Sequence, residues 1–361
     1  MEGKLRDGAT TQVVVKNNNQ EIEEIHDKTQ METAILKNNE RKYHQTEGSS
    51  QLLVEECIEM FGNYGEGNKV ENILHGSLTY PSWFSQDTMD FLSACKRRYD
   101  PTIHISEPDI CARYFNLKTS WRKRKERTCT YGEHIGHYKA IMWDPYLSWL
   151  LFQRSEIPEK TGYSPSRHRK CVDLMVLKKA QVFDINKQRI IGILETEYNH
   201  SNRTLGREGM SKALELDAIA PEQFSRPGRS SIDQSTLKRL CTDHQHYNRE
   251  CFAQTSIDLA NNYDRIIHTA AALALLRIGV SHSKIKTLFE SIQKMTHRVR
   301  TAYGDSHDTY GGCTTDDWEN HPQGILQGNA CGPTVWALIS SIIFECLRKR
   351  CFSNFLLRFI T

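Results

Sequence analysis

Residues 256–266 read SIDLANNYDRI, and this stretch decides how the rest of the sequence is interpreted. The residues before it, Cys251 to Ile257, are rich in β-prone side chains and predict a strand that ends at Asp258. A carboxylate at the end of a buried strand turns its oxygens toward a cleft, where they can bind a divalent cation. The same pattern also fits an Asp258 that merely caps a helix and an Asp264 on the surface.

A second informative stretch lies further along the chain, where residues 324–336 read GILQGNACGPTVW. Gly328 and Gly332 allow the backbone to approach a ligand closely, and Gln327 offers both a hydrogen-bond donor and an acceptor. Pro333 predicts the start of a helix that supports the turn. Taken alone, this stretch is equally compatible with a purely structural turn.

The order and spacing of these two stretches resemble the palm of reverse transcriptases of the non-LTR retrotransposon type. Upstream segments extend the resemblance over about residues 120 to 345. Residues 128–140 (TCTYGEHIGHYKA) are similar to the entry segment of such enzymes, and residues 222–230 (EQFSRPGRS) are similar to the block between fingers and palm. Lys178-Lys179 and Arg189-Ile190-Ile191 resemble the two basic fingers strands.

The resemblance implies a two-metal nucleotidyl transfer. Asp258 would coordinate the Mg²⁺ ions that activate the primer 3′-hydroxyl and stabilise the leaving pyrophosphate. Tyr263 would act as the steric gate that excludes a ribose 2′-hydroxyl, although an ordinary core tyrosine is the alternative. Asp264 would fix the start of the following helix.

The resemblance also implies a nucleotide-binding set. Lys178 or Lys179 would neutralise the triphosphate as a point charge, and Arg189 would do so through a bidentate fork. Gln327 and Gly328 would line the sugar and base pocket.

The mixture of helices and strands without βαβ alternation predicts an α+β fold, mostly helical with a small antiparallel sheet. Its clearest element is a hairpin formed by Val172–Leu177 and Ile190–Leu194. By resemblance, the architecture would be a polymerase right hand with fingers and an incomplete palm. The expected division is a disordered or weakly helical extension (1–75), a helical lead-in (76–120), a fingers-like region (121–250) and a partial palm (251–361).

A complete family member continues to a hairpin that carries an Asp-Asp pair, and then to a thumb. From Val335 to Thr361 the sequence contains no Asp, and the pair Asp316-Asp317 precedes the Gln-Gly turn. A single carboxylate coordinates two divalent cations only weakly. We therefore expect a fragment that stops before the second metal motif and has little polymerase activity alone.

The net charge of +3 hides a basic segment. Residues 96–189 contain 20 Lys/Arg and 10 Asp/Glu, an excess of +10, so the remaining residues sum to −7. Such a segment is typical of a polyanion-binding surface, although a solvated helix face is the simpler explanation of any single cluster. The expected partners are an RNA template, a DNA primer and dNTPs. A non-catalytic RNA- or DNA-binding protein and an unrelated helical interaction protein are the alternatives.

The 11 cysteines are scattered, and none are spaced as C-x-x-C, so we expect reduced thiols. A metal site at Cys129, His134 and His137 would lack a second ligand pair at zinc spacing. No apolar run approaches the ~20 residues of a membrane span, and the first residues lack a signal core. The sequence therefore predicts an intracellular protein that is neither secreted nor in a membrane, without an obligate protein partner.

Overall fold

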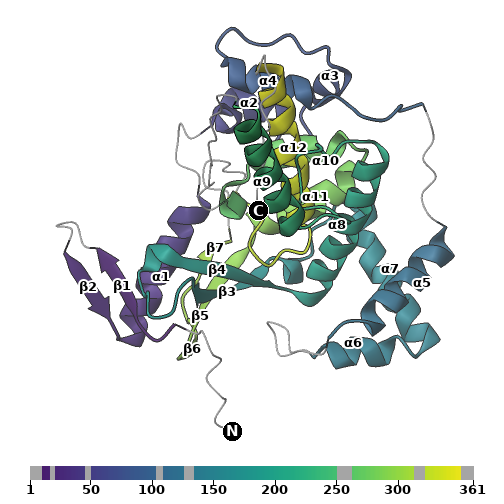
Figure 1. Ribbon diagram of the computed structural model, residues 1–361. Coiled ribbons are helices and arrows are strands. Elements are labelled where there is room, and N and C mark those ends of the chain that lie inside the picture. Colours follow the sequence, from purple (N-terminus) through teal and green to yellow (C-terminus); the bar gives the residue numbers. More distant parts are fainter. Residues whose placement is uncertain are drawn as a thin grey trace.

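The computed structural model describes residues 10–16, 21–44, 50–102, 109–125, 134–249, 262–312 and 322–350. Within them the fold is α+β and mainly helical, as the sequence predicted (Figure 1). The strands are β1 (Val13–Lys16), β2 (Ile22–Ile25), β3 (Lys170–Leu177), β4 (Gln188–Leu194), β5 (Thr296–Thr301), β6 (Gly304–Asp305) and β7 (Tyr310–Gly311). The α-helices are α1 (Lys28–Tyr43), α2 (Glu55–Phe61), α3 (Val70–His75), α4 (Gln86–Ala94), α5 (Ile110–Arg122), α6 (Ile135–Ile141), α7 (Pro145–Thr161), α8 (Thr196–Glu215), α9 (Ser231–Tyr247), α10 (His268–Leu276), α11 (His282–Gln293) and α12 (Gly332–Arg350). Four short 3₁₀ helices are η1 (Gln51–Leu53), η2 (Ser166–His168), η3 (Ile185–Lys187) and η4 (Asn262–Arg265).

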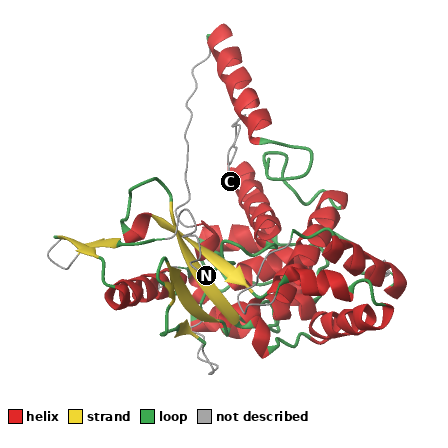
Figure 2. Cartoon of the chain, turned by 90° about the horizontal axis from the view of Figure 1, so that it is seen from below, coloured by secondary structure: helices red, strands yellow, loops and turns green. Residues whose placement is uncertain are grey.

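The main sheet has five strands in the order β4-β3-β5-β6, with β7 also paired to β5. The predicted hairpin is confirmed, because β3 and β4 run antiparallel with Cys171 opposite Leu194 and Leu177 opposite Gln188. The smaller β1–β2 sheet is a separate antiparallel pair. Figure 2 shows the strands gathered on one side of the molecule and most helices on the other.

The parallel pairing of β3 with β5 was not predicted and makes the main sheet mixed rather than antiparallel. The strand β5 itself was not predicted from the sequence. Residues 296–301 read THRVRT, and their burial alternates, with His297, Val299 and Thr301 facing inward. A period of two is the mark of a half-buried strand, but six residues after an apolar helix give a weak signal.

The hydrophobic core is centred on α10, in which all nine residues are buried. Its sequence, HTAAALALL, supplies small alanines that allow α3, α11 and α12 to pack closely around it. Arg277, just after α10, is 1% exposed and forms an ion pair with Glu345 of α12 (2.7 Å). The helix α12 also packs against α8 and α4, so it joins the helical layers.

The described part of the first 75 residues is more ordered than expected, because it includes α1, a 16-residue helix packed against the main sheet. Its few apolar residues share one face, where Met31, Ile35 and Tyr43 are fully buried. The average composition of the segment did not reveal this face, because most other positions of the helix are polar. Residues 1–9, 17–20 and 45–49 of the expected extension lie outside the described residues.

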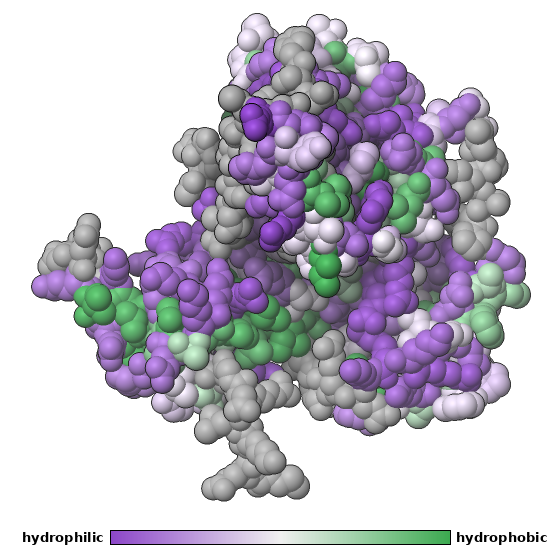
Figure 3. All heavy atoms as spheres, in the orientation of Figure 1, coloured by the Kyte–Doolittle hydropathy of each residue, from purple (hydrophilic) through white to green (hydrophobic). Residues whose placement is uncertain are grey.

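The surface agrees with a chain rich in polar residues. In Figure 3, apolar atoms gather over β3 and β4, while much of the rest of that face is hydrophilic. On the less buried face of this hairpin, Leu174 lies opposite Ile191 and Val176 lies opposite Arg189. Among the described helices, none combines the length and apolar character needed to cross a bilayer.

Replacing Ile35 with Ala tests whether α1 belongs to the folded core. Because Ile35 is fully buried, Ile35→Ala should lower the free energy of unfolding by about 2–5 kcal/mol in urea denaturation. The exposed Lys37 on the same helix supplies the control, and Lys37→Ala should change it by less than about 0.5 kcal/mol. Equal midpoints for both variants would show that α1 is not part of the cooperative unit.

Candidate functional site

A hollow of about 370 Å³ lies between the edge strand β4 and the turn that precedes α12. Four of the seven predicted site residues line it: Arg189, Tyr263, Gln327 and Gly328. The other described lining residues are Leu326, Asn329 and Pro333. Three segments that lie far apart in the sequence therefore meet at one place.

The turn is fixed against β4 by backbone contact. The Gly192 N–H donates to the Gln327 carbonyl (2.7 Å), and a Cβ on Gly328 would lie 2.3 Å from the Gly192 oxygen. Gly328 also has a φ of 120°, which side chains rarely adopt. On the other side, Asn199 of α8 donates to the Gly328 carbonyl (3.1 Å) and accepts from the Ala330 N–H (2.9 Å). The turn is thus held by two elements, and its glycine is required by both space and conformation.

Tyr263 belongs to η4, which is also bound to the turn region. The Ile325 N–H donates to the Tyr263 carbonyl (2.8 Å), and the tyrosine ring lies against Gly332, where a Cβ would be 2.9 Å from it. Tyr263 is half-buried, and burial raises the pKa of its phenol. The side chain therefore lies at the border between core and hollow, where it can contact a bound molecule.

Arg189 gives the hollow its charge. Its side chain is exposed, and it forms no ion pair with any described residue. The described lining contains no carboxylate. A concave site with a guanidinium and no carboxylate in its described lining attracts anions, and the planar guanidinium favours phosphate or carboxylate groups.

Lys178 and Lys179 lie at the turn of the hairpin, as the sequence predicted, but outside the described lining of the hollow. They directly follow β3, are exposed, and are not among the described residues that line the hollow. Lys178 instead lies within electrostatic range of Lys42 and Asp264. The hairpin thus brings Arg189 into the hollow and leaves both lysines at its turn.

Asp264 is a buried carboxyl next to the hollow-lining Tyr263. Its Oδ1 atom has no hydrogen-bond partner within the described residues, and burial raises its pKa to about 7. Lys42 and Lys178 lower the pKa, whereas Asp173 raises it further. Asp264 does not start the next helix as expected, because α10 begins at His268 without a side-chain cap from the described residues.

The described lining does not itself form a magnesium site. It offers amide and backbone oxygens, whereas Mg²⁺ is held in proteins through carboxylates and phosphates. The predicted ligand Asp258 lies outside the described residues, as do the expected strand Cys251–Ile257 and the pair Asp316-Asp317. Magnesium binding by Asp258 therefore stays a prediction.

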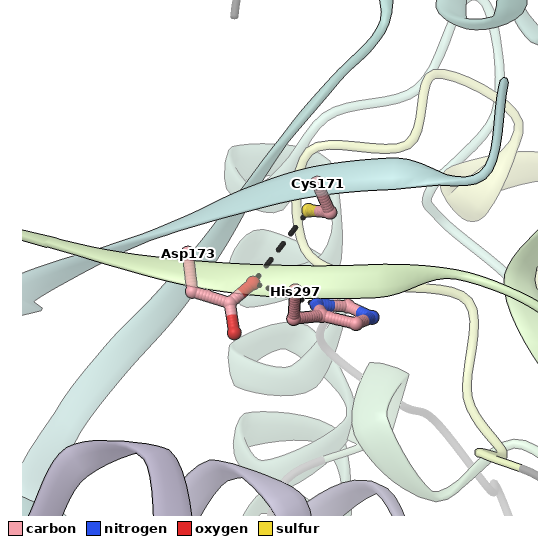
Figure 4. Close-up of side chains that lie close together, drawn as sticks. All are labelled: Cys171, Asp173 and His297. Atoms are coloured by element: carbon pink, nitrogen blue, oxygen red, sulfur yellow. Dashed lines mark hydrogen bonds and ion pairs between the residues drawn. The ribbon is translucent and has the colours of Figure 1, made fainter. Parts of the chain in front are cut away.

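A polar cluster that the sequence analysis missed lies inside the sheet (Figure 4). Cys171 and Asp173 of β3 and His297 of β5 are buried, and their ligand atoms lie within 4.8 Å of one another. Asp173 Oδ1 accepts from His297 Nδ1 (3.0 Å) and from the Cys171 thiol (3.6 Å). The only hint in the sequence is an acidic residue within the apolar run CVDLMVL.

Hydrogen bonds satisfy both carboxylate oxygens of this cluster, whereas the buried His297 Nε2 has no hydrogen-bond partner among the described residues. Asp173 Oδ2 accepts from the Tyr310 hydroxyl and from the Asn39 amide (3.3 Å), so both carboxylate oxygens are engaged. The His297 ring also stacks between Tyr43 (5.7 Å) and Tyr310 (4.7 Å). Because a buried carboxylate is stable only when it is hydrogen-bonded, this network ties α1 and β7 to the sheet.

The alternative metal site near residue 130 is not assembled by the described residues. His134 accepts a hydrogen bond from the Gly136 N–H at the start of α6, and its ring centroid lies 6.4 Å from that of His137. Cys129 lies outside the described residues.

No protein-family model matches the sequence, and no curated protein matches it either. The functional interpretation of the hollow therefore rests on its own geometry and chemistry.

Replacing Gly328 with Ala tests the contact between the turn and β4. Gly328→Ala should lower the free energy of unfolding by at least about 2 kcal/mol more than Gly304→Ala does. Gly304 is a matched control, because it also has a positive φ (106°) but has open space around its Cβ position. Similar losses in both variants, measured by urea denaturation, would show that β4 and the turn do not touch.

Replacing Asp264 with Asn tests its buried state. Because burial raises the folded-state pKa to about 7 from an ordinary 3.8, the protonated carboxyl stabilises the fold below about pH 4. That contribution is lost as the pH rises through about 7. Asp264→Asn should therefore remove this fall in the free energy of unfolding between pH 4 and pH 8. At pH 8 the variant should be more stable than the parent by on the order of 1–3 kcal/mol.

Urea denaturation from pH 4 to pH 8 measures this effect. The exposed Asp243 provides the control, and Asp243→Asn should follow the pH dependence of the parent chain. If the free energy of unfolding of Asp264→Asn changed with pH in the same way as that of the parent, Asp264 would be ionised in the folded protein.

Proposed function

We propose that the hollow binds a deoxynucleoside triphosphate and serves RNA-templated DNA synthesis of the reverse transcriptase kind. The observation that carries this proposal is the meeting of Arg189, Tyr263, Gln327 and Gly328 in one concave site. The sequence motifs alone single out the same four residues. A set of unrelated surface residues would have no reason to converge.

Each residue has a task that suits its chemistry. Arg189 binds phosphate oxygens through two parallel N–H donors. Gln327 presents an amide to the sugar or base, and Gly328 leaves room for the nucleotide beside it. Tyr263 places a rigid ring where a ribose 2′-hydroxyl would collide. Lys178 and Lys179 are exposed on flexible side chains, so they neutralise the triphosphate from the hairpin turn.

In this proposal the β3–β4 hairpin forms the fingers of a polymerase right hand, and η4, α10, β5 and the 326–332 turn belong to its palm. The RNA template and DNA primer would lie next to the hollow. The Mg²⁺ ions would be held with the help of Asp258 and would supply the Lewis acid for phosphoryl transfer.

Nucleotide binding is the direct test, because it depends on residues that line the hollow, such as Arg189 and Gln327. Fluorescence titration with a fluorescent dATP analogue should give an affinity that falls about 10- to 100-fold in Arg189→Ala, the value of one charge-assisted bidentate contact. Arg239 on α9 is 83% exposed and provides the matched control. Arg239→Ala should bind as the parent does.

Gln327→Ala supplies a second, uncharged probe of the same site. It should weaken binding about 5- to 10-fold, as expected for one neutral hydrogen bond. Equal affinities for the parent chain, Arg189→Ala and Gln327→Ala would refute the proposed nucleotide site. The thermal unfolding of each variant should match that of the parent, since both side chains border open space.

A further inference from the structure

Helices α5, α6 and α7 lie together at one side of the molecule (Figure 1). A second surface, remote in sequence from the hollow residues, combines aromatic rings with cations on α5, on α7 and on the segment between α6 and α7. Along α5, Tyr114, Lys118 and Arg122 follow one another at intervals of four residues, so they share one face of the helix. Trp143 lies at one end of this row, and Trp149 lies at the other. We call these five residues the aromatic–basic ridge.

Two groups of contacts make up the ridge. The Arg122 guanidinium lies 4.0 Å from the centroid of the Trp143 ring, and Lys118 Nζ lies 5.3 Å from that of Tyr114. Tyr114 then packs edge-on against Trp149, with ring centroids 5.3 Å apart. Two cations are thus held beside aromatic faces over about 12 Å of helix.

Arg122, Trp143 and Trp149 of the ridge are exposed, whereas Tyr114 and Lys118 are half-buried, and the ridge lies in a basic region. Trp143 is 72% exposed, which is unusual for the largest apolar side chain. Residues 109–125 and 134–161 contain nine Lys/Arg and four Asp/Glu, a net charge of +5. Glu156 is already paired with Arg113 and Lys160, and Asp144 caps α7. The positive charge of the surface is therefore only weakly offset by these carboxylates.

We propose that the aromatic–basic ridge binds single-stranded nucleic acid. An unpaired base can stack on the exposed face of Trp143, while Arg122 and Lys118 neutralise the adjacent phosphates. A duplex hides its base faces and would use only the cations. A protein partner would favour an interface whose centre is depleted of charge, whereas here lysine and arginine occupy the middle of the row.

Nucleic-acid binding at the ridge gives a role to basic residues that do not contribute to the hollow. Of the basic excess found between residues 96 and 189, only Lys178, Lys179 and Arg189 belong to the proposed nucleotide site. The ridge gives a role to part of the remainder. It stands whether or not the hollow binds a nucleotide.

Fluorescence anisotropy with labelled oligouridylate tests the ridge. Trp143→Ala should weaken binding about 5- to 150-fold, the effect of losing one stacked base. Trp83→Ala is the matched control, because Trp83 is also exposed (42%) but lies before α4, outside the basic region. Trp143→Phe keeps an aromatic face and should retain most of the affinity, which separates stacking from a folding defect.

Two further readouts complete the test. Arg122→Ala should reduce the slope of log affinity against log salt by about 0.7, the value for one phosphate contact on a single strand. Trp143→Ala should bind the dATP analogue as the parent does, so a failure of the ridge is distinguishable from a failure of the hollow. Equal oligouridylate affinities for Trp143→Ala and Trp83→Ala, or tighter binding of an oligouridylate–oligoadenylate duplex than of the single strand, would overturn the proposal.

Discussion

The hydrogen bond from the Gly192 N–H to the Gln327 carbonyl (2.7 Å) is the contact on which the candidate site depends. The strand β4 is at the edge of the sheet, so its outward backbone groups need a partner or water. The turn supplies that partner and is drawn within reach of Arg189 on the same strand. Any side chain at Gly328 would separate the two backbones, and the hollow would lose one wall.

The buried Asp173 network supports this edge from within the sheet. Its carboxylate is bonded from α1, β5 and β7, and therefore fixes β3, which in turn carries β4. Placing a charge in the core is costly unless every lone pair is used, so the network is sensitive to the loss of any partner. In the observed register His297 of β5 lies opposite Cys171 of β3 and reaches the carboxylate of Asp173, two residues further along β3.

Local patterns predicted the hairpin, the 326–332 turn and α12, because each depends on residues close together in the sequence. They also selected Arg189, Tyr263, Gln327 and Gly328, although a resemblance rather than physics suggested their meeting. The sequence could not predict β5 or the Asp173 network, since both depend on pairing between distant segments. The sequence correctly ended the first hairpin strand at Leu177, directly before Lys178 and Lys179, but it could not show that these lysines lie outside the described lining of the hollow, because that depends on how the hairpin packs against the 326–332 turn. Asp258, on which the metal chemistry would depend, lies outside the described residues.

The parallel pairing of β3 with β5 has a consequence for synthesis on the ribosome. Leu174 pairs with Arg300, so one edge of β3 lacks its neighbour until more than a hundred further residues have been translated. At typical elongation rates this interval is on the order of ten seconds. During it, an apolar hairpin with a free edge invites association with other nascent chains. The chain would therefore benefit from chaperones that shield this edge until β5 has emerged.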